Sequence, residues 1–127
     1  MDKKLLKEFA LSLYGRLSTE AVDLIKANEV RIGAWVPQPH LCHDNVSFWV
    51  KNNPAHKHVY GFLYFPNFLP LGYVEFGLHS VIEVENGDLV DITPNDAEFD
   101  YSFLRHTGTF EEYKEIAEMS PVITLPI

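Results

Sequence analysis

The sequence predicts one α+β domain in which helices pack against an antiparallel β-sheet. Apolar residues recur at helical spacing near the start of the chain and again after Cys42. Between residues 77 and 94, two runs rich in β-branched residues flank Asn86-Gly87, which is typical of a β-hairpin. The length of 127 residues fits a single domain, 1–127, without a linker or an internal repeat.

The composition narrows the range of partners. Hydrophobic residues make up 46% of the chain and aromatic residues 13%, which is enough for a packed core and leaves a homodimer open. The net charge of −8 argues against nucleic acid and anionic membranes as partners. No apolar run approaches the roughly 20 residues of a membrane helix, and the start lacks the apolar core of a signal peptide. We therefore expect a cytoplasmic protein.

The first 28 residues are expected to form a helical pair, and residues 29–127 the α+β core. One helix is predicted from Lys3 to Gly15, because Gly15 is a suitable residue to end it. Ser18 is a suitable N-cap for a second helix that ends at Asn28. The apolar face of the first helix contains Leu5, Leu6, Phe9, Leu13 and Tyr14.

A further short helix is predicted to begin near Cys42 and to end before Pro54. Apolar residues follow Cys42 at helical spacing, and Pro37 and Pro39 separate this helix from an extended segment expected at residues 29–36. Cys42 then lies in the first turn, where free backbone N–H groups and the helix dipole stabilise a thiolate. The thiolate is the nucleophilic form of cysteine.

The rest of the chain is predicted to alternate between extended segments and loops, with one more helix. In chain order we expect a strand at 56–65, an apolar loop at 66–72, a strand entering the hairpin at 73–76, an acidic loop at 95–100, a strand or packed segment at 101–104, a helix at 109–119 capped by Thr109, and an extended tail at 120–127. The aromatic segment 65–73 is expected to form the wall of a groove.

The loop of the predicted hairpin decides whether His79 and Asp91 lie on one face of the sheet. A two-residue loop would place them on opposite faces, because side chains of a strand alternate between faces. A three-residue loop, 85–87, would place Asp91 opposite Val81 and roughly 5–8 Å from His79 between Cβ atoms. A type I turn followed by Gly87 in the left-handed region forms such a loop, and we predict it.

Three spaced motifs follow one another in the middle half of the chain. The first is Cys42 at a helix start. The second is a strand that contains Gly61, followed by the motif His79-Ser80-Val81-Ile82-Glu83. The third is Asp91-Ile92-Thr93-Pro94. This order resembles the papain-like superfamily of cysteine hydrolases, and most closely its transglutaminase-like branch. Because Val81 stands where that branch usually has Trp, the small cell-wall peptidases are a second branch that the chain resembles.

The resemblance implies acyl transfer without a cofactor. Cys42 would attack the carbonyl of an amide or peptide bond in a peptide or protein substrate, and His79 would move the proton. Asp91 would orient His79 and stabilise its charged form. The backbone N–H of Cys42 and one side chain would bind the oxyanion. The candidate side chains for that role are Gln38 and, as weaker choices, Asn45 and Trp35.

Two other functions stay open at the level of the sequence. A metal site could be formed by His40, Cys42 and His43, completed by His79 and Asp91, although the spacing matches no known zinc signature well. A non-catalytic protein-binding or inhibitor module on the same fold is the other alternative, because a fold does not determine a function. Loss of Cys42 would be harmless to such a module.

Overall fold

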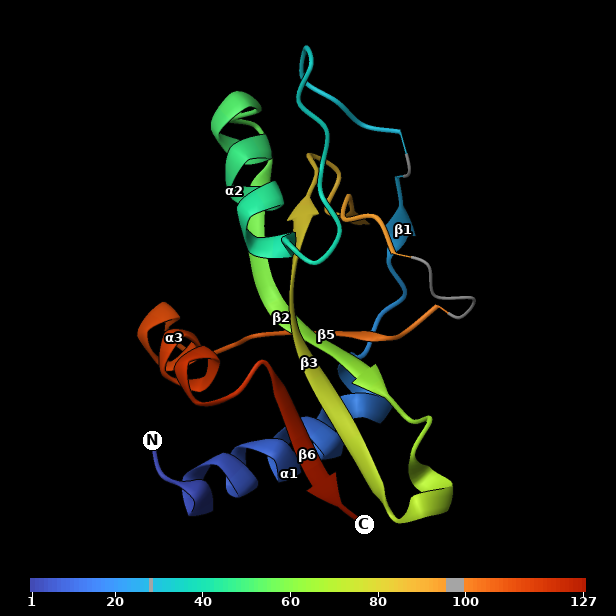
Figure 1. The fold of residues 1–127 in the computed structure, drawn as a ribbon, viewed down its shortest axis with the longest axis vertical. Helices are drawn as coiled ribbons and strands as arrows, with labels where there is room; N and C mark the ends of the chain where they lie inside the picture. Colours follow the sequence, from blue (N-terminus) through green and yellow to red (C-terminus); the bar gives the residue numbers. More distant parts are fainter. Residues whose placement is uncertain (28, 96–99) are drawn as a thin grey trace.

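The structure is a computed structural model, and it describes residues 1–27, 29–95 and 100–127. These residues form three α-helices, a short 3₁₀ helix and a six-stranded sheet (Figure 1). In chain order the elements are α1 (Lys3–Glu20), β1 (Ile25–Lys26), α2 (Cys42–Asn52), β2 (Lys57–Phe65), η1 (Leu69–Leu71), β3 (Tyr73–Glu83), β4 (Leu89–Asp91), β5 (Phe103–Arg105), α3 (Phe110–Met119) and β6 (Val122–Pro126). The α+β class predicted from the sequence is confirmed.

The sheet has the strand order β1-β4-β3-β2-β5, with β6 also paired to β3. The long hairpin of β2 and β3 forms its centre, and these two strands pair along their whole length from Lys57–Glu83 to Phe65–Glu75. The expected sheet was antiparallel throughout, but β1 pairs with β4 in parallel, so the sheet is mixed. Ile25 and Lys26 are too few to have been recognised as a strand from their own pattern.

All three helices pack on the same face of the sheet. Side chains of β2 and β3 alternate between the two faces, and one alternating set meets the helices. The main core cluster combines α1, α3 and four strands in Ala10, Leu13, Phe62, Val74, Phe76, Leu104, Tyr113, Ile116, Ile123 and Leu125. Val46 of α2 continues this layer by packing with Ile82 and Ile92. Burial of this apolar surface is the main force that holds the helices on the sheet.

The opposite face of the sheet carries a smaller core. Val59, Val81 and Phe103 are buried there, and Leu24 from the segment after α1 packs against them. His79 alternates with Ser80 along β3 and therefore belongs to this face, two residues from Val81. The small core thus ends next to the residues of the candidate site.

The predicted N-terminal helical pair is wrong, because α1 runs without interruption from Lys3 to Glu20 through Gly15 and Ser18. A glycine inside a helix costs roughly 0.5–1 kcal/mol relative to alanine, which does not end a helix whose face is buried. The following Val22 exchanges two backbone hydrogen bonds with Phe103, at 2.9 and 2.8 Å. Of the segment expected to be the second helix, residues 19–20 belong to α1 and residues 21–27 are not helical.

The predicted extended segment at residues 29–36 is also wrong. Ile32 and Trp35 exchange two backbone hydrogen bonds, at 3.0 and 2.9 Å, and enclose a tight turn. Gly33 has a φ of 59°, a conformation that glycine adopts without steric cost. Most of the acidic loop expected at 95–100 lies outside the described residues. At its end, Asp100 lies 3.4 Å from the ammonium group of Lys26.

Several local predictions are confirmed. The second helix of the structure, α2, begins at Cys42 and ends at Asn52, before Pro54. Thr109 caps α3, because its hydroxyl accepts a hydrogen bond from the Glu112 N–H at 3.1 Å. None of the helices in the described parts of the chain is both long enough and apolar enough to cross a bilayer.

The three-residue loop of the hairpin is confirmed as well. Ile82 pairs with Val90, and the Val84 N–H donates to the Asp88 carbonyl at 3.0 Å, which leaves residues 85–87 as the loop. Gly87 has a φ of 91°, as the predicted turn requires. This register places Asp91 opposite Val81, on the same face as His79.

Candidate active site

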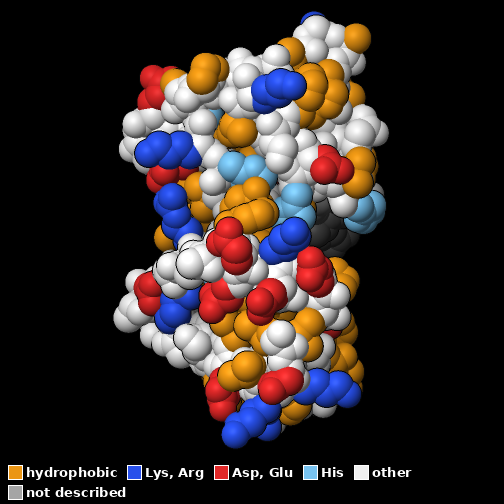
Figure 2. Space-filling model, turned by 90° about the vertical axis from the view of Figure 1, so that its left-hand side faces the viewer, with side chains coloured by type: hydrophobic (Ala, Val, Ile, Leu, Met, Phe, Trp, Pro, Cys, Tyr) orange, Lys and Arg blue, Asp and Glu red, His pale blue; other side chains and the backbone are white. Residues whose placement is uncertain are grey.

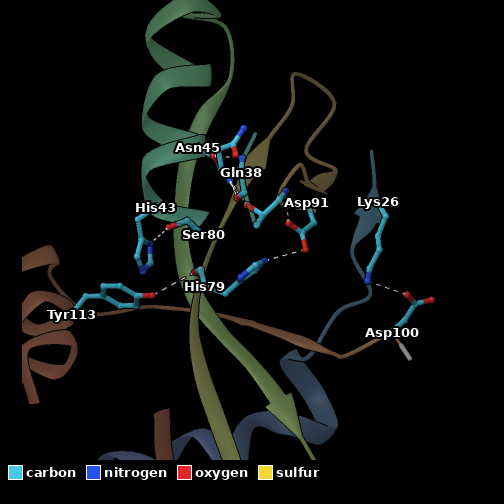
Figure 3. Close-up of polar contacts among 10 residues, drawn as sticks. Lys26, Gln38, His43, Asn45, His79, Ser80, Asp91, Asp100 and Tyr113 are labelled. Carbon is cyan, nitrogen blue, oxygen red and sulfur yellow. Dashed lines mark hydrogen bonds and ion pairs between the residues drawn. The ribbon is translucent and has the colours of Figure 1, made fainter. Parts of the chain in front are cut away.

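His79 and Asp91 form a buried hydrogen bond across β3 and β4. The Nε2 atom of His79 lies 3.0 Å from Oδ2 of Asp91, and the two side chains are only 11% and 3% exposed (Figure 3). The other carboxylate oxygen, Oδ1, accepts a hydrogen bond from the Thr93 N–H at 3.1 Å. Both oxygens of Asp91 are therefore engaged, and the carboxylate has a fixed orientation towards the ring.

The environment of His79 favours its charged form. Burial alone would lower the pKa of His79, but the hydrogen bonds with Asp91 and with Cys42, together with their charges, raise the pKa to about 9. Since Nε2 faces Asp91, Nδ1 is the ring nitrogen left for Cys42. The imidazole thus lies between a carboxylate and a thiol and is an imidazolium at neutral pH.

Cys42 is the first residue of α2 and is partly exposed. The N-cap residue, Leu41, provides no side-chain hydrogen bond to the first turn. The N–H groups of that turn are not bonded within the helix, and they carry the positive end of the helix dipole. This is the setting expected from the sequence, and it favours negative charge on the sulfur and on any oxygen beside it.

The start of α2 reaches His79 around an edge of β3. On this edge β6 pairs with Tyr73–Gly77 and β4 pairs with Ile82–Glu83 and ends opposite Val81, so residues 78–80 face no strand among the described residues. Cys42 contacts His79 on one face of the sheet, while the next residue, His43, contacts Ser80 on the other. The first turn of α2 therefore straddles the open part of the β3 edge.

A groove with a volume of about 510 Å³ opens beside Cys42 and His79. It is lined by Pro39, His40, Cys42, Leu63, Phe65, Gly77, Leu78, His79, Thr93, Pro94, Asn95, Tyr101, Pro121 and Val122. The described part of this lining contains no Asp, Glu, Lys or Arg. The Phe65 ring lies against Gly77, where a Cβ atom would approach it to 2.6 Å, and meets Tyr101 edge-on at 4.6 Å between ring centroids. The groove is thus largely apolar and leads to the thiol.

The expected groove wall at residues 65–73 is only partly correct. Phe65 lines the groove, but Phe68 stacks on Tyr73 instead, with ring centroids 5.1 Å apart, and neither contributes to the lining. The rest of the lining comes from β2, β3 and β6, from the start of α2 and the residues before it, from the residues after β4 and from Tyr101. The sheet topology brings these segments together, and the local sequence pattern of residues 65–73 does not indicate that topology.

The structure does not bring the proposed oxyanion side chains to the groove. The Gln38 side chain is exposed, and its amide donates to the Val36 carbonyl at 3.2 Å. Trp35 packs against Phe48, with ring centroids 4.5 Å apart. Neither residue lines the groove, so among the groups considered from the sequence the backbone N–H of Cys42 is the one at the thiol.

Asn45 has a supporting position. Its side chain exchanges hydrogen bonds with the backbone of Gln38 at 3.0 and 2.8 Å and donates to the Thr93 hydroxyl at 3.0 Å. The Thr93 N–H in turn holds Asp91. Asn45 therefore ties α2 to both the preceding loop and the segment that orients the carboxylate (Figure 3).

The histidines beside Cys42 do not form a metal site with it. His43 is bonded to Ser80, and His40 is exposed with a φ of 66°. Within the residues that the structure describes, no group of three or more His, Cys, Asp or Glu side chains is arranged to hold a metal ion. The donor set considered from the sequence is thus divided between the two faces of the sheet.

Tyr113 is a residue at the site that the sequence pattern did not reveal. Its hydroxyl donates to the Gly61 carbonyl at 2.9 Å and to the His79 carbonyl at 3.4 Å. Burial, followed by the nearby charge of Cys42, raises the pKa of Tyr113. Tyr113 is one of the buried residues of α3, so helical periodicity predicts its burial but not the strand residue that it contacts.

Comparisons of the chain with family models, with curated proteins and with solved structures each returned no significant match. The interpretation of the site therefore depends on its geometry and on the chemistry of its residues.

The raised pKa of His79 predicts a pH dependence of stability. The folded state holds the His79 proton more tightly than the unfolded chain, so the resulting stabilisation is complete below pH 6.5 and is lost as the pH rises to about 9. We expect the free energy of unfolding to fall by about 1–3 kcal/mol over this interval. Urea denaturation at several pH values measures it.

The variant Asp91→Asn tests whether His79 causes this pH dependence. In this variant the free energy of unfolding should fall less as the pH rises, because the Asp91 carboxylate is the main group that raises the pKa of His79. Asp88→Asn, an exposed acidic residue of the same hairpin, is the matched control and should keep the wild-type pH dependence. Equal pH dependence in Asp91→Asn and the wild type would contradict the assignment.

Proposed function

We propose that this protein is a cysteine-dependent hydrolase or acyltransferase that acts on amide or peptide bonds through Cys42, His79 and Asp91. The observation that carries the proposal is the position of the His79 ring. It is held by Asp91 at one nitrogen and lies beside the Cys42 thiol at the other, where a largely apolar groove opens. A nucleophile, a base and a group that orients the base are the parts of a catalytic triad.

The proposed reaction has two steps. The Cys42 sulfur attacks the carbonyl carbon of the amide, and the C–N bond breaks as His79 gives its proton to the leaving amine. The product of this step is a thioester on Cys42. Water or an acceptor amine then attacks the thioester, loses a proton to His79 and releases the acyl group, which regenerates the thiolate and imidazolium.

The oxyanion of each tetrahedral intermediate forms next to the first turn of α2. The backbone N–H of Cys42 is a donor there, and the helix dipole adds to its effect. Asp91 orients the ring and stabilises the imidazolium that is present before the first step and forms again when His79 takes the proton of the attacking nucleophile. His79 thus carries out every proton transfer of the cycle.

The groove favours a substrate with an uncharged, apolar group next to the scissile bond. Leu63, Phe65 and Val122 provide apolar contact, whereas a charged group would be desolvated in a groove whose described lining has no Asp, Glu, Lys or Arg to pair with it. A peptide segment with such a residue is the substrate class that we propose. We also propose a cytoplasmic setting, because a nucleophilic thiol stays reduced there.

The proposal predicts fast alkylation of Cys42 that depends on His79. At neutral pH iodoacetamide should modify the wild-type protein faster than the His79→Ala variant, by on the order of tenfold or more, because the imidazolium stabilises the thiolate. Intact-mass spectrometry over time gives the two rate constants, and Cys42 is the single cysteine of the chain.

His56→Gln is the matched control for this experiment. His56 stacks on Trp49 and accepts a hydrogen bond from its indole N–H at 3.0 Å, outside the groove lining. Its replacement should leave the alkylation rate unchanged. If Cys42 reacts no faster in the wild type than in His79→Ala, the catalytic proposal is contradicted. A non-catalytic binding module would then be the better description.

The character of the groove predicts a preference among reactive peptides. Chloromethyl ketones of acetyl-Leu, acetyl-Asp and acetyl-Lys share one reactive group, and we expect the Leu compound to label Cys42 fastest, by about tenfold. Val122→Lys should shift the preference towards the Asp compound, whereas Val122→Thr, of similar size, should not. Equal labelling by all three compounds would argue against an apolar substrate.

A further inference from the structure

A polar cluster centred on the buried Ser80 lies behind the candidate active site, on the face of β3 opposite to His79. The Ser80 hydroxyl contacts Nδ1 of His43 and, at 2.7 Å, Nε2 of His58. Ser80 is fully buried. The chemistry proposed above does not use these three residues.

The cluster is closed by aromatic side chains. The Tyr60 ring stacks on His58, with centroids 3.9 Å apart, and lies 6.0 Å from the ring of His43. Tyr113 meets His43 edge-on at 5.9 Å. Figure 2 shows the side of the molecule formed by α2 and α3, where histidine side chains lie among hydrophobic ones in the middle of the face. Because Ser80 itself is fully buried, little water can replace the hydrogen bonds of its hydroxyl.

One hydroxyl proton serves two imidazole rings in this cluster. Ser80 donates to one ring nitrogen, and the other ring donates its N–H to the hydroxyl oxygen, so the set is complete when both rings are neutral. Burial, followed by the charge of His79, lowers the pKa of His43, although Asp44 opposes this effect. Burial, followed by His43, lowers the pKa of His58 to about 4.

The cluster is connected to the reactive residues by the chain itself. His43 follows Cys42 on α2, and Ser80 follows His79 on β3. The His43–Ser80 hydrogen bond therefore joins the same two elements as the Cys42–His79 contact, one residue further along each element. We propose that Ser80 and His43 are positioning residues that set the separation of the Cys42 sulfur and the His79 ring, with His58 holding the Ser80 hydroxyl.

This proposal rests on the proposed function, and it identifies a contact that places the start of α2 on β3, in addition to the hydrogen bonds of Asn45 to Gln38 and Thr93. The apolar contact of Val46 with Ile82 holds the helix against the sheet, but such contacts have no fixed direction. Leu41 offers no capping side chain. The His43–Ser80 hydrogen bond is directional and lies within one residue of the sulfur. Because a displacement of about 1 Å can cost on the order of 100-fold in rate, a bond at this position affects reactivity.

The test compares Ser80→Ala with the wild type in two measurements. The rate of Cys42 alkylation by iodoacetamide at neutral pH should fall by on the order of tenfold or more. The titration of the His79 ring, followed by NMR, should move from about 9 towards 6.5, because contact with Cys42 contributes to the raised pKa. A purely structural serine would not move this titration once circular dichroism shows that the variant is folded.

Two substitutions of His43 provide a matched pair. His43→Asn keeps an amide group near the position of Nδ1 and should retain most of the alkylation rate, whereas His43→Phe keeps a ring without the hydrogen bond and should lose it. Ser47→Ala is the control, because Ser47 contacts the far side of His58 at 3.5 Å and is exposed. It should react like the wild type.

The outcomes separate this proposal from the proposed function. Wild-type alkylation and an unchanged His79 titration in folded Ser80→Ala would overturn the positioning role. If Ser80→Ala does not fold, equal rates in His43→Asn and His43→Phe would overturn it. Failure of the proposed function has a different signature, namely equal alkylation of the wild type and His79→Ala. In that case the His79 titration in Ser80→Ala still decides on the positioning role.

Discussion

The hydrogen bond between His79 and Asp91 depends on the length of one turn. Residues 85–87 form a three-residue loop with Gly87 in the left-handed region, and this loop places Asp91 on the face of His79. A loop one residue shorter would turn the carboxylate to the other face of the sheet, because the side-chain period of a strand is two. The orientation and the charge of the His79 ring, and therefore the proposed chemistry, depend on this register.

The second constraint is the interrupted edge of β3. Two short strands, β4 and β6, pair with its ends and leave the middle open, and the first turn of α2 lies there. Cys42 and His43 consequently reach opposite faces of the same strand. One contact serves the proposed reaction, and the other holds the helix through Ser80. A helix start and a strand edge thus form a site that neither element contains alone.

Local signals in the sequence predicted the parts of the site that depend on neighbouring residues. The turn at Gly87, the start of α2 at Cys42 and the Thr109 cap each depend on a few adjacent residues, and each is confirmed. The continuous helix through Gly15 was missed because the buried face of α1 outweighs the weak preference of one glycine.

Long-range pairings could not be inferred in the same way. The parallel pairing of Ile25 with Val90 joins segments far apart in the chain, and their own patterns do not indicate it. The contacts of Ser80 depend on the register of β2 against β3, which sets Tyr60 opposite Ser80 and His58 opposite Ile82. Gln38 was placed at the oxyanion by its distance in sequence from Cys42, but its side chain bonds within its own loop.

In the proposed site, Asp91 acts on Cys42 through His79, and the three residues work as one unit. The most direct measurement is a double-mutant cycle on the alkylation rate of Cys42, with His79→Ala, Asp91→Asn and the variant that carries both. We expect Asp91→Asn to slow alkylation in the wild-type background and to change nothing further once His79 is absent. An equal effect of Asp91→Asn in both backgrounds would contradict it, because the carboxylate would then act independently of the ring.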